Sequence, residues 1–223
     1  DICAGTGHLA AAAAVRGAQA EGLDFAAALV EIAAATYPHI AVRVGDAEHL
    51  PFGDGSFALV ANAFGLWHLG DPECGLREAF RVLVASGRFA FSTWLPPERG
   101  FDLLRILMYA IRKHGILDVG LPPVPPPFRF AERSECDSVL RTIGFTNVSA
   151  AEHVCTWTGH DGRELLDLMD KSLVRVPMLI DHQTAEARER IKMEIVEAAE
   201  EFRQGNRIVL MFPYLLVTAT RPS

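Results

Sequence analysis

Short apolar runs alternate with longer runs of helix-forming residues along the first 94 residues. The apolar runs are nearly continuous, which is typical of strands buried on both faces of a parallel sheet. The intervening runs are rich in alanine or have helical periodicity, and turn residues close them. The predicted strands are 18–23, 40–44, 57–62 and 87–93, and the predicted helices are 8–16, 26–36 and 71–84.

The pattern changes after residue 95. An amphipathic helix is predicted over 101–114, and the proline-rich run 121–130 should be extended because proline lacks an amide hydrogen. We expect residues 95–130 to form an insertion, either a linker or a cap that walls a pocket. The later predicted helices are 131–143, 163–174 and 185–203, and the later strands are 147–157 and 207–220.

Strands that alternate with helices predict an α/β fold: three layers, doubly wound and Rossmann-like, with a mostly parallel sheet. We expect one domain over residues 1–223. Ligands bind beyond the carboxyl ends of the strands in such sheets. Three suitable groups fall there, namely the turn Gly5-Thr6-Gly7, Asp24 and Asp46.

The turn Gly5-Thr6-Gly7 leads into an alanine-rich helix. Glycine takes positive φ easily and allows ligand atoms close to its backbone, and a helix start offers unpaired N–H groups. This combination predicts a cradle for a nucleotide-like cofactor. A strand is expected ahead of Asp1, so we also expect that an N-terminal segment is missing from the sequence.

Composition narrows the function classes. Half of the 223 residues are hydrophobic, the formal charge is −7 and there is no dense basic cluster, so nucleic acid is not expected as a partner. No apolar run approaches the roughly 20 residues needed to span a bilayer. The four scattered cysteines lack metal or disulfide spacing, which predicts a reducing, cytoplasmic location and no metal.

Several motifs together resemble class I S-adenosylmethionine (SAM)-dependent methyltransferases, in the small-molecule branch that includes the ubiquinone/menaquinone C-methyltransferases. Asp1–Gly7 is similar to the D-x-x-x-G-x-G signature, and Gly22–Phe25 to the acidic motif of the second strand. Gly45–Phe52 resembles the third motif, and Leu69–Pro72 with Arg81–Leu83 resembles the region of the fifth strand. The likeness covers about residues 1–94. It implies a seven-stranded sheet with an antiparallel C-terminal strand and a helical, proline-rich cap.

The resemblance also implies how the cofactor SAM would be held. Asp1 would orient its ammonium end, Asp24 would accept from both ribose hydroxyls, and Asp46 would accept from the adenine amino group. The Ala47 N–H would donate to the adenine ring. The remaining implied contacts are Phe25 and Leu50, which would flank the ring, and Ala4, Gly5, Gly7, Asn62 and Ala63.

The implied reaction is methyl transfer to a small, partly apolar molecule, with a homodimer left open. A base is needed only if the acceptor must lose a proton, and His68 is the best-placed candidate; the alternative is a histidine that packs beside the cofactor. Phe64 and Trp67 are expected as pocket or core walls. Tyr109 and His114 could reach a substrate from the cap helix, although His114 also suits an exposed surface.

Two other functions stay open. Gly5-x-Gly7-x-x-Ala10 satisfies a relaxed dinucleotide pattern, with Asp24 near the distance expected of a ribose acid, so an NAD(P)-dependent oxidoreductase is the first alternative. A dehydrogenase has no need of Asp1 or of the motif around Asp46. The second alternative is a SAM-binding regulatory subunit that does not catalyse.

Overall fold

The computed structural model describes residues 1–121, 125–173 and 175–223. They divide into two compact units. The first unit contains residues 1–94, 125–153 and 214–223, and the second contains 95–121 and the described part of 154–213.

The first unit contains all the strands and helices predicted within the first 94 residues, which confirms those predictions. Their bounds differ from the predicted ones by a few residues at the ends. The elements are α1 (His8–Val15), β1 (Glu21–Asp24), α2 (Ala27–Thr36), β2 (Ala41–Val44), β3 (Phe57–Ala63), the 3-10 turn η1 (Leu66–His68), α3 (Pro72–Val82) and β4 (Leu83–Trp94), followed later by η3 (Arg129–Ala131) and α5 (Arg133–Ile143).

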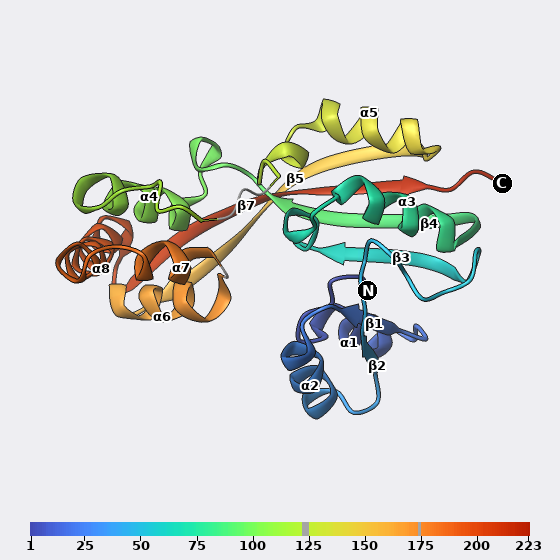
Figure 1. The fold of residues 1–223 in the computed structure, drawn as a ribbon, viewed down its shortest axis with the longest axis horizontal. Helices are drawn as coiled ribbons and strands as arrows, with labels where there is room; N and C mark the ends of the chain where they lie inside the picture. Colours follow the sequence, from blue (N-terminus) through green and yellow to red (C-terminus); the bar gives the residue numbers. More distant parts are fainter. Residues whose placement is uncertain (122–124, 174) are drawn as a thin grey trace. The chain divides into compact units, whose positions relative to one another are not determined.

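Local chemistry explains where these helices begin and end. Asp71 caps α3 by accepting from the Cys74 N–H at 3.0 Å, and Pro72 occupies the first turn, where its missing N–H costs nothing. Gly144 ends α5 at φ 117°, a conformation that favours glycine. α3 packs against both α5 and β4 (Figure 1).

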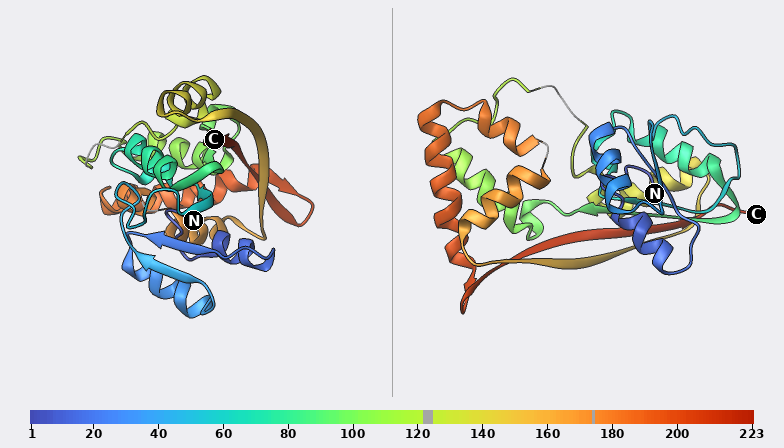
Figure 2. Two further views of the ribbon diagram at one scale, coloured as in Figure 1. Left: turned by 90° about the vertical axis from the view of Figure 1, so that its right-hand side faces the viewer. Right: turned by 90° about the horizontal axis from the view of Figure 1, so that it is seen from below.

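The seven strands that the structure describes lie in two sheets rather than in the single sheet expected. β1 pairs with β2 in parallel, and a five-stranded sheet has the order β3-β4-β7-β5, with β6 (Arg203–Gln204) paired to β7. β3 and β4 are parallel, whereas the C-terminal strand β7 (Arg207–Thr220) is antiparallel to β4, as predicted. β5 (Thr146–Gly159) and β7 are the two long neighbouring strands (Figure 2). The sheets are therefore mixed, within an α/β fold.

The first residues of the sequence join the two sheets, and Asp1 and Ala4, as well as Ile2, bond to β1. Ile2 forms an isolated parallel bridge with Leu23 of β1, and its N–H donates to Ala61 O of β3 at 2.9 Å. The N–H of Leu23 in turn donates to Asp1 O at 2.9 Å. One bridge is too short to count as a strand, and this is why the expected continuous sheet is divided. A second cavity of about 500 Å³ lies beside Ile2, lined by residues of β1, β3 and α1.

Aromatic side chains fill the core under α5. The rings of Phe89 and Phe145 stack with centroids 5.5 Å apart, and Phe80 meets Phe145 edge-on at 4.9 Å. Phe91 meets Phe130 at 6.0 Å. These contacts tie α3, β4 and the segment before α5 into one core.

The second unit is mostly helical. Its elements are η2 (Pro97–Arg99), α4 (Asp102–His114), α6 (Gly162–Ser172), α7 (Arg175–Asp181), α8 (Ala185–Ala199) and η4 (Glu200–Phe202), with parts of β5 and β7. α8 packs against both α4 and α6. The helix α7 was not predicted, and the helix expected to run to residue 203 ends at Ala199, where the chain turns into η4 and β6.

The predicted insertion, residues 95–130, is divided between the two units, and residues 122–124 of its proline-rich run lie outside the described residues. Residue 174, the predicted end of one helix, lies outside them as well. Among the helices that the structure describes, none has the length and apolar character needed to cross a bilayer.

Candidate functional site

A cavity of about 350 Å³ opens at the ends of β1 and β2, within the size range of small-molecule sites. Residues from four separate stretches line it: the start of the sequence, the end of β1, the end of β2, and the end of η1 with the two residues after it. They are Cys3, Leu23, Asp24, Phe25, Gly45, Asp46, Ala47, Glu48, His68, Leu69 and Gly70. Five predicted site residues therefore meet here: Asp24, Phe25, Asp46, Ala47 and His68.

Asp24 ends β1 and is buried, at 5% exposure. Its Oδ2 accepts from the Gly5 N–H at 2.8 Å, and its Oδ1 accepts from the Ala26 N–H at 2.9 Å. An ionised carboxylate has about four acceptor sites, so these two bonds fix its orientation and leave capacity for a ligand. Asp24 can thus hold a diol while it keeps the glycine turn in place.

Asp46 lies at the start of the loop after β2. Its Oδ1 accepts from the Glu48 N–H at 2.8 Å, and its Oδ2 lies 3.0 Å from His49 Nδ1. The bond to His49 lowers the pKa of Asp46 below its usual range, and the Glu48 N–H adds to this effect. The same contact raises the pKa of His49. Asp46 therefore stays ionised at neutral pH, and the loop presents a carboxylate to the cavity.

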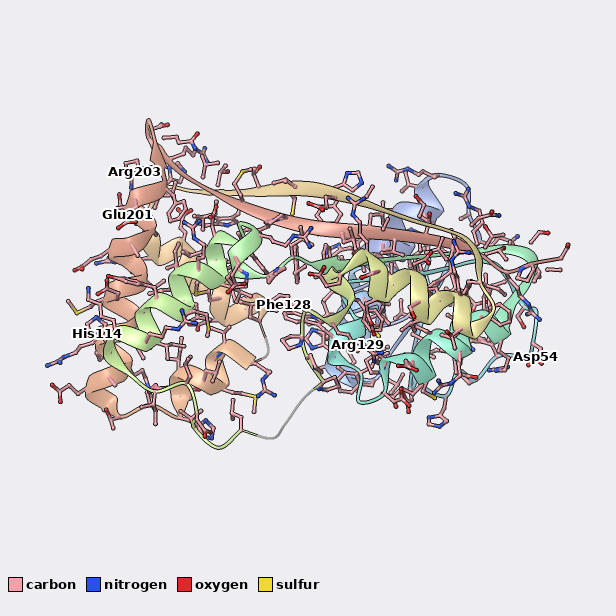
Figure 3. All side chains as sticks on the ribbon, turned by 90° about the horizontal axis from the view of Figure 1, so that it is seen from above. Asp54, His114, Phe128, Arg129, Glu201 and Arg203 are labelled. Carbon is pink, nitrogen blue, oxygen red and sulfur yellow. The ribbon has the colours of Figure 1, made fainter. Side chains whose placement is uncertain are left out.

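A buttress of two α3 side chains holds this loop. Glu78 Oε2 accepts from the Leu50 N–H at 2.7 Å, and Arg81 forms a two-pronged pair with Glu78 at 2.7 and 2.8 Å. Arg81 also donates to Leu50 O at 3.0 Å, and to Phe52 O and Asp54 (labelled in Figure 3) at 2.8 Å each. The planar guanidinium suits this set of acceptors, and the loop's path is fixed from outside the cavity.

The glycine turn has the backbone conformation expected of it. Gly5 and Gly7 have φ of 53° and 82°, and nothing lies within 4 Å of the place where a Gly5 side chain would stand. That space suits close approach of a ligand to the backbone. Gly7 precedes α1, and no side chain caps the first N–H groups of this helix.

Asp1 does not lie in the same cavity as Asp24 and Asp46. Its carboxylate oxygens are buried and have no hydrogen-bond partner within the described part of the chain. Asp1 lines the second cavity and does not line the first. A buried, unpaired carboxylate is costly, and it fits a site that a cation is meant to complete.

Apolar side chains also line the cavity. Phe25 is 72% exposed although it is a large aromatic residue, and it lines the cavity together with Leu23 and Leu69. An exposed ring beside Asp24 and Asp46 suits a flat heterocycle with polar edges. Leu50, which was also expected against the adenine, instead lines the second cavity.

His68 reaches the cavity from η1, opposite the strand ends. Its ring keeps an exposed side, yet the protein around it lowers the pKa of the imidazole through desolvation. Cys3 lies nearby at φ 56°, and burial raises the pKa of its thiol to about 12, with the charge of Asp24 adding to the shift. The pair therefore offers a neutral imidazole and a protonated thiol at neutral pH.

Other predicted site residues lie outside the cavity lining. Asn62 is buried, and its amide bonds only backbone groups of Ile2, Gly65 and Leu66, as described below. Phe64 stacks on Trp94 at 3.8 Å, so it is part of an aromatic cluster. The cavity lining does not include the following predicted residues of this unit: Ala4, Gly5, Gly7, Ala63 and Trp67.

The two predicted substrate residues of the cap helix belong to the second unit. His114 is largely buried rather than exposed, and its Nε2 lies 2.8 Å from Glu194 Oε2. Glu194 also accepts from Lys113 Nζ at 2.8 Å, and that ammonium lies 5.4 Å from the ring of Tyr109. Tyr109 itself is 52% exposed. Figure 3 labels His114 at the end of α4.

Sequence reasoning did not assign six lining residues to the site: Cys3, Leu23, Gly45, Glu48, Leu69 and Gly70. Glu48 was visible as the second acid of the Gly45–Phe52 motif, and its Oε1 accepts from the Asp71 N–H at 2.8 Å. Cys3 was visible only as a residue inside the Asp1–Gly7 motif. No group of three or more His, Cys, Asp or Glu side chains that could hold a metal occurs among the residues that the structure describes.

Known proteins resemble this chain in sequence and in fold. Residues 1–91 match the family described as "Methyltransferase domain". A demethylmenaquinone methyltransferase of Chlorobaculum parvum is 40% identical over 88 residues, which is 39% of this chain and 36% of that protein. The chain thus spans less than half the length of the curated relatives that it matches first.

Solved structures cover more of the chain. The YcgJ protein from Bacillus subtilis aligns with a TM-score of 0.60 at 20% identity, over 100% of this chain and 91% of that one. Phosphoethanolamine N-methyltransferase 2 of Haemonchus contortus, in complex with phosphomonomethylethanolamine and S-adenosylhomocysteine, aligns with a TM-score of 0.57 at 14% identity, over 100% and 48%. Neither alternative function gains support from these matches. Residues 1–91 thus match a methyltransferase domain and resemble the demethylmenaquinone methyltransferases in sequence, and the fold resembles that of these solved structures.

Proposed function

We propose that this protein transfers a methyl group from SAM to a small, partly apolar molecule and releases S-adenosylhomocysteine (SAH). The observation that carries the proposal is the convergence of Asp24, Asp46 and His68 on one cavity, beside an open glycine turn. The methyltransferase domain match of residues 1–91 supports the same conclusion.

The residues present fit the cofactor. Asp24 has spare acceptor capacity for two ribose hydroxyls, and Asp46 with the Ala47 N–H matches the edge of an adenine that Phe25 would flank. The unpaired carboxylate of Asp1 is chemically suited to an ammonium group, but it lines the second cavity and not this one. Asp24, Asp46 and Glu48 together make the cavity acidic, which favours a positively charged ligand.

When bound, the cofactor would supply an activated methyl group on a sulfonium centre. The protein then has to align the acceptor and exclude water. The apolar side chains of Leu23, Phe25 and Leu69 contribute to that exclusion. His68 would accept a proton from an acceptor hydroxyl, since its lowered pKa keeps it neutral at pH 7. Packing beside the cofactor is the competing role for His68.

Several parts of the proposal concern the acceptor side. The substrate cap of residues 95–130 and the acceptor contacts of Tyr109, His114, Phe64 and Trp67 stay predictions from the sequence. The name of the curated relatives makes a demethylmenaquinone-like quinone the first acceptor to try. A homodimer and a cytoplasmic location stay predictions.

Calorimetry with SAM, SAH and NADH tests the cofactor directly. We expect micromolar binding of SAM and SAH and no heat with NADH. Heat with NADH alone would replace the proposal with the dehydrogenase alternative. Incubation with methyl-labelled SAM and a quinone acceptor then tests transfer, and SAH binding without transfer to any acceptor in a metabolite mixture would favour the regulatory subunit.

His68→Ala separates the two roles of that residue. If His68 is a base, the variant turns over more slowly by about 10²–10⁴-fold while SAH affinity stays close to that of the unaltered protein. Equal turnover would return His68 to a packing role.

A further inference from the structure

Asn62 joins the two walls of the cavity without lining it. The residue lies near the end of β3 and is 2% exposed. Its Nδ2 donates to Ile2 O at 2.9 Å, and its Oδ1 accepts from the N–H groups of Gly65 at 2.9 Å and Leu66 at 3.2 Å. All three partners are backbone groups, and two N–H donors facing one atom require that atom to be the oxygen.

The two segments that Asn62 holds both supply lining residues. Ile2 is followed directly by Cys3 and the glycine turn, whereas Gly65 and Leu66 open the turn η1 that presents His68. One side chain thus fixes the spacing between the glycine turn and the imidazole.

The two segments pack directly against each other, so that no side chain fits at Gly65 without a shift. A Cβ on Gly65 would lie 2.4 Å from Cys3 Cβ and 2.6 Å from Asn62 Nδ2. Phe64, just ahead, has φ of 60°, which is rare for an aromatic residue. The chain therefore turns sharply after β3 and lies directly against Cys3, and the three bonds of Asn62 stabilise it there.

The amide has no simple substitute at this place. An apolar side chain would leave two N–H groups and one carbonyl unpaired in a buried position, and a carboxylate would face the Ile2 carbonyl with charge. A neutral group that both donates and accepts satisfies all three partners at once.

We propose that Asn62 is a positioning residue that holds His68 at a fixed place relative to the glycine turn, so that both walls of the cavity bind the cofactor as one rigid unit. This inference rests on the proposed function for its ligand. It replaces the direct cofactor contact expected of Asn62 from the family resemblance, because the amide is engaged by the protein backbone.

The test compares Asn62→Ala with Val60→Ala. Val60 lies on the same strand and is 4% exposed, so its truncation matches the loss of buried volume without touching the loop. Two quantities are measured: the pKa of His68, from NMR titration of its ring signals, and the affinity for SAH, from calorimetry.

In Asn62→Ala we expect the His68 pKa to rise toward its ordinary value, because the ring leaves its partly desolvated position, and SAH affinity to fall by 10-fold or more. In Val60→Ala both should stay within twofold of the unaltered protein. Unchanged His68 titration in Asn62→Ala, or equal changes in both variants, would overturn the positioning role.

If Asn62→Ala does not fold, as judged by its melting curve, Asn62→Ser is measured by the same criteria because its hydroxyl can still serve one partner. Failure of both variants to fold would assign Asn62 to folding alone and overturn the proposal. If the unaltered protein binds no SAH, the proposed function fails, yet the His68 titrations of the ligand-free proteins still decide the role of Asn62.

Discussion

The Gly5 N–H donates to Asp24 Oδ2 at 2.8 Å, across 19 residues of sequence. This bond ties the glycine turn to the end of β1, so the residue proposed to hold the ribose also shapes the turn beside it. The two motifs that are farthest upstream in the sequence therefore act as one structural element.

Asp24→Asn should weaken SAH binding. The variant loses the charge and one acceptor oxygen, and hydrogen bonds to a charged group contribute about 1.5–3 kcal/mol, so we expect a loss of about 10–150-fold. Calorimetry measures the change. Glu21→Gln is the matched control, since Glu21 lies on the same strand in an exposed pair with Arg43 and should leave affinity unchanged. Unaltered affinity in Asp24→Asn would mean that Asp24 does not bind the cofactor.

Arg81→Met should destabilise the protein and loosen the loop after β2. It removes the bonds to Leu50 O and Phe52 O and leaves Glu78 without its cation, at a cost of about 1–3 kcal/mol. For a chain of this length each kcal/mol lowers the Tm by about 2–4 °C. Arg77→Met, on the same helix but in exposed pairs, should change the Tm little. Equal melting of the two variants would contradict the buttress.

Cys3 should resist alkylation. Burial raises the pKa of Cys3 and Cys136 to about 12, and the thiolate is the reactive form, so both should react slowly with iodoacetamide at pH 8. Cys155 is exposed and should be labelled before either of them, although its thiol also has a raised pKa. Peptide mass spectrometry over time gives the order, with full labelling in denaturant as the control. Rapid labelling of Cys3 would show that its thiol is ionised.

Glu194 should make the second unit sensitive to acid. Bonds from Lys113, and then from His114, lower the pKa of Glu194. A lowered pKa means that this stabilisation is present above the unfolded value of 4.5 and is lost as the pH falls through the folded value. Glu194→Gln should therefore lower the Tm at pH 7, and the difference from the unaltered protein should shrink toward pH 3.

Glu186→Gln, on the exposed face of the same helix, controls for the loss of a carboxylate. A Tm difference for Glu194→Gln that is the same at both pH values would show that the ion pair does not stabilise this unit.

The sequence predicted the strands and helices of the first 94 residues well because their signals are local. Strand ends, glycine turns and helix caps depend on neighbouring residues, and Asp24 and Asp46 lie where the strand pattern put them. The sequence did not predict the division of the sheet at Ile2, where one isolated bridge stands in place of a paired strand.

Contacts between distant residues explain two other differences. The role of Asn62 depends on Ile2, 60 positions away, and the burial of His114 depends on Glu194, 80 positions away. Neither partner can be chosen from the sequence, because many acidic residues of the later helices would suit a cation equally well.

The helix α7 was missed for a local reason. Its sequence contains Pro177, and a proline inside an apolar run usually argues against a helix. The helix begins at Arg175, so this proline lies within the first turn, where its missing N–H has no partner to lose. A proline fits a short helix only within its first turn, and the sequence alone does not show where α7 begins.

The contacts around Ile2 also affect how cooperatively this unit unfolds. Residues 1–4 bond to Glu21 and Leu23 of β1 and to Ala61 and Asn62 of β3, so they connect the block that contains β1 and β2 to the second sheet. The cavity takes Asp24 and Asp46 from that block, and His68 and Leu69 from beyond it. A bound ligand that contacts both would therefore stabilise both against opening, and amide hydrogen exchange would show a joint rise in their protection.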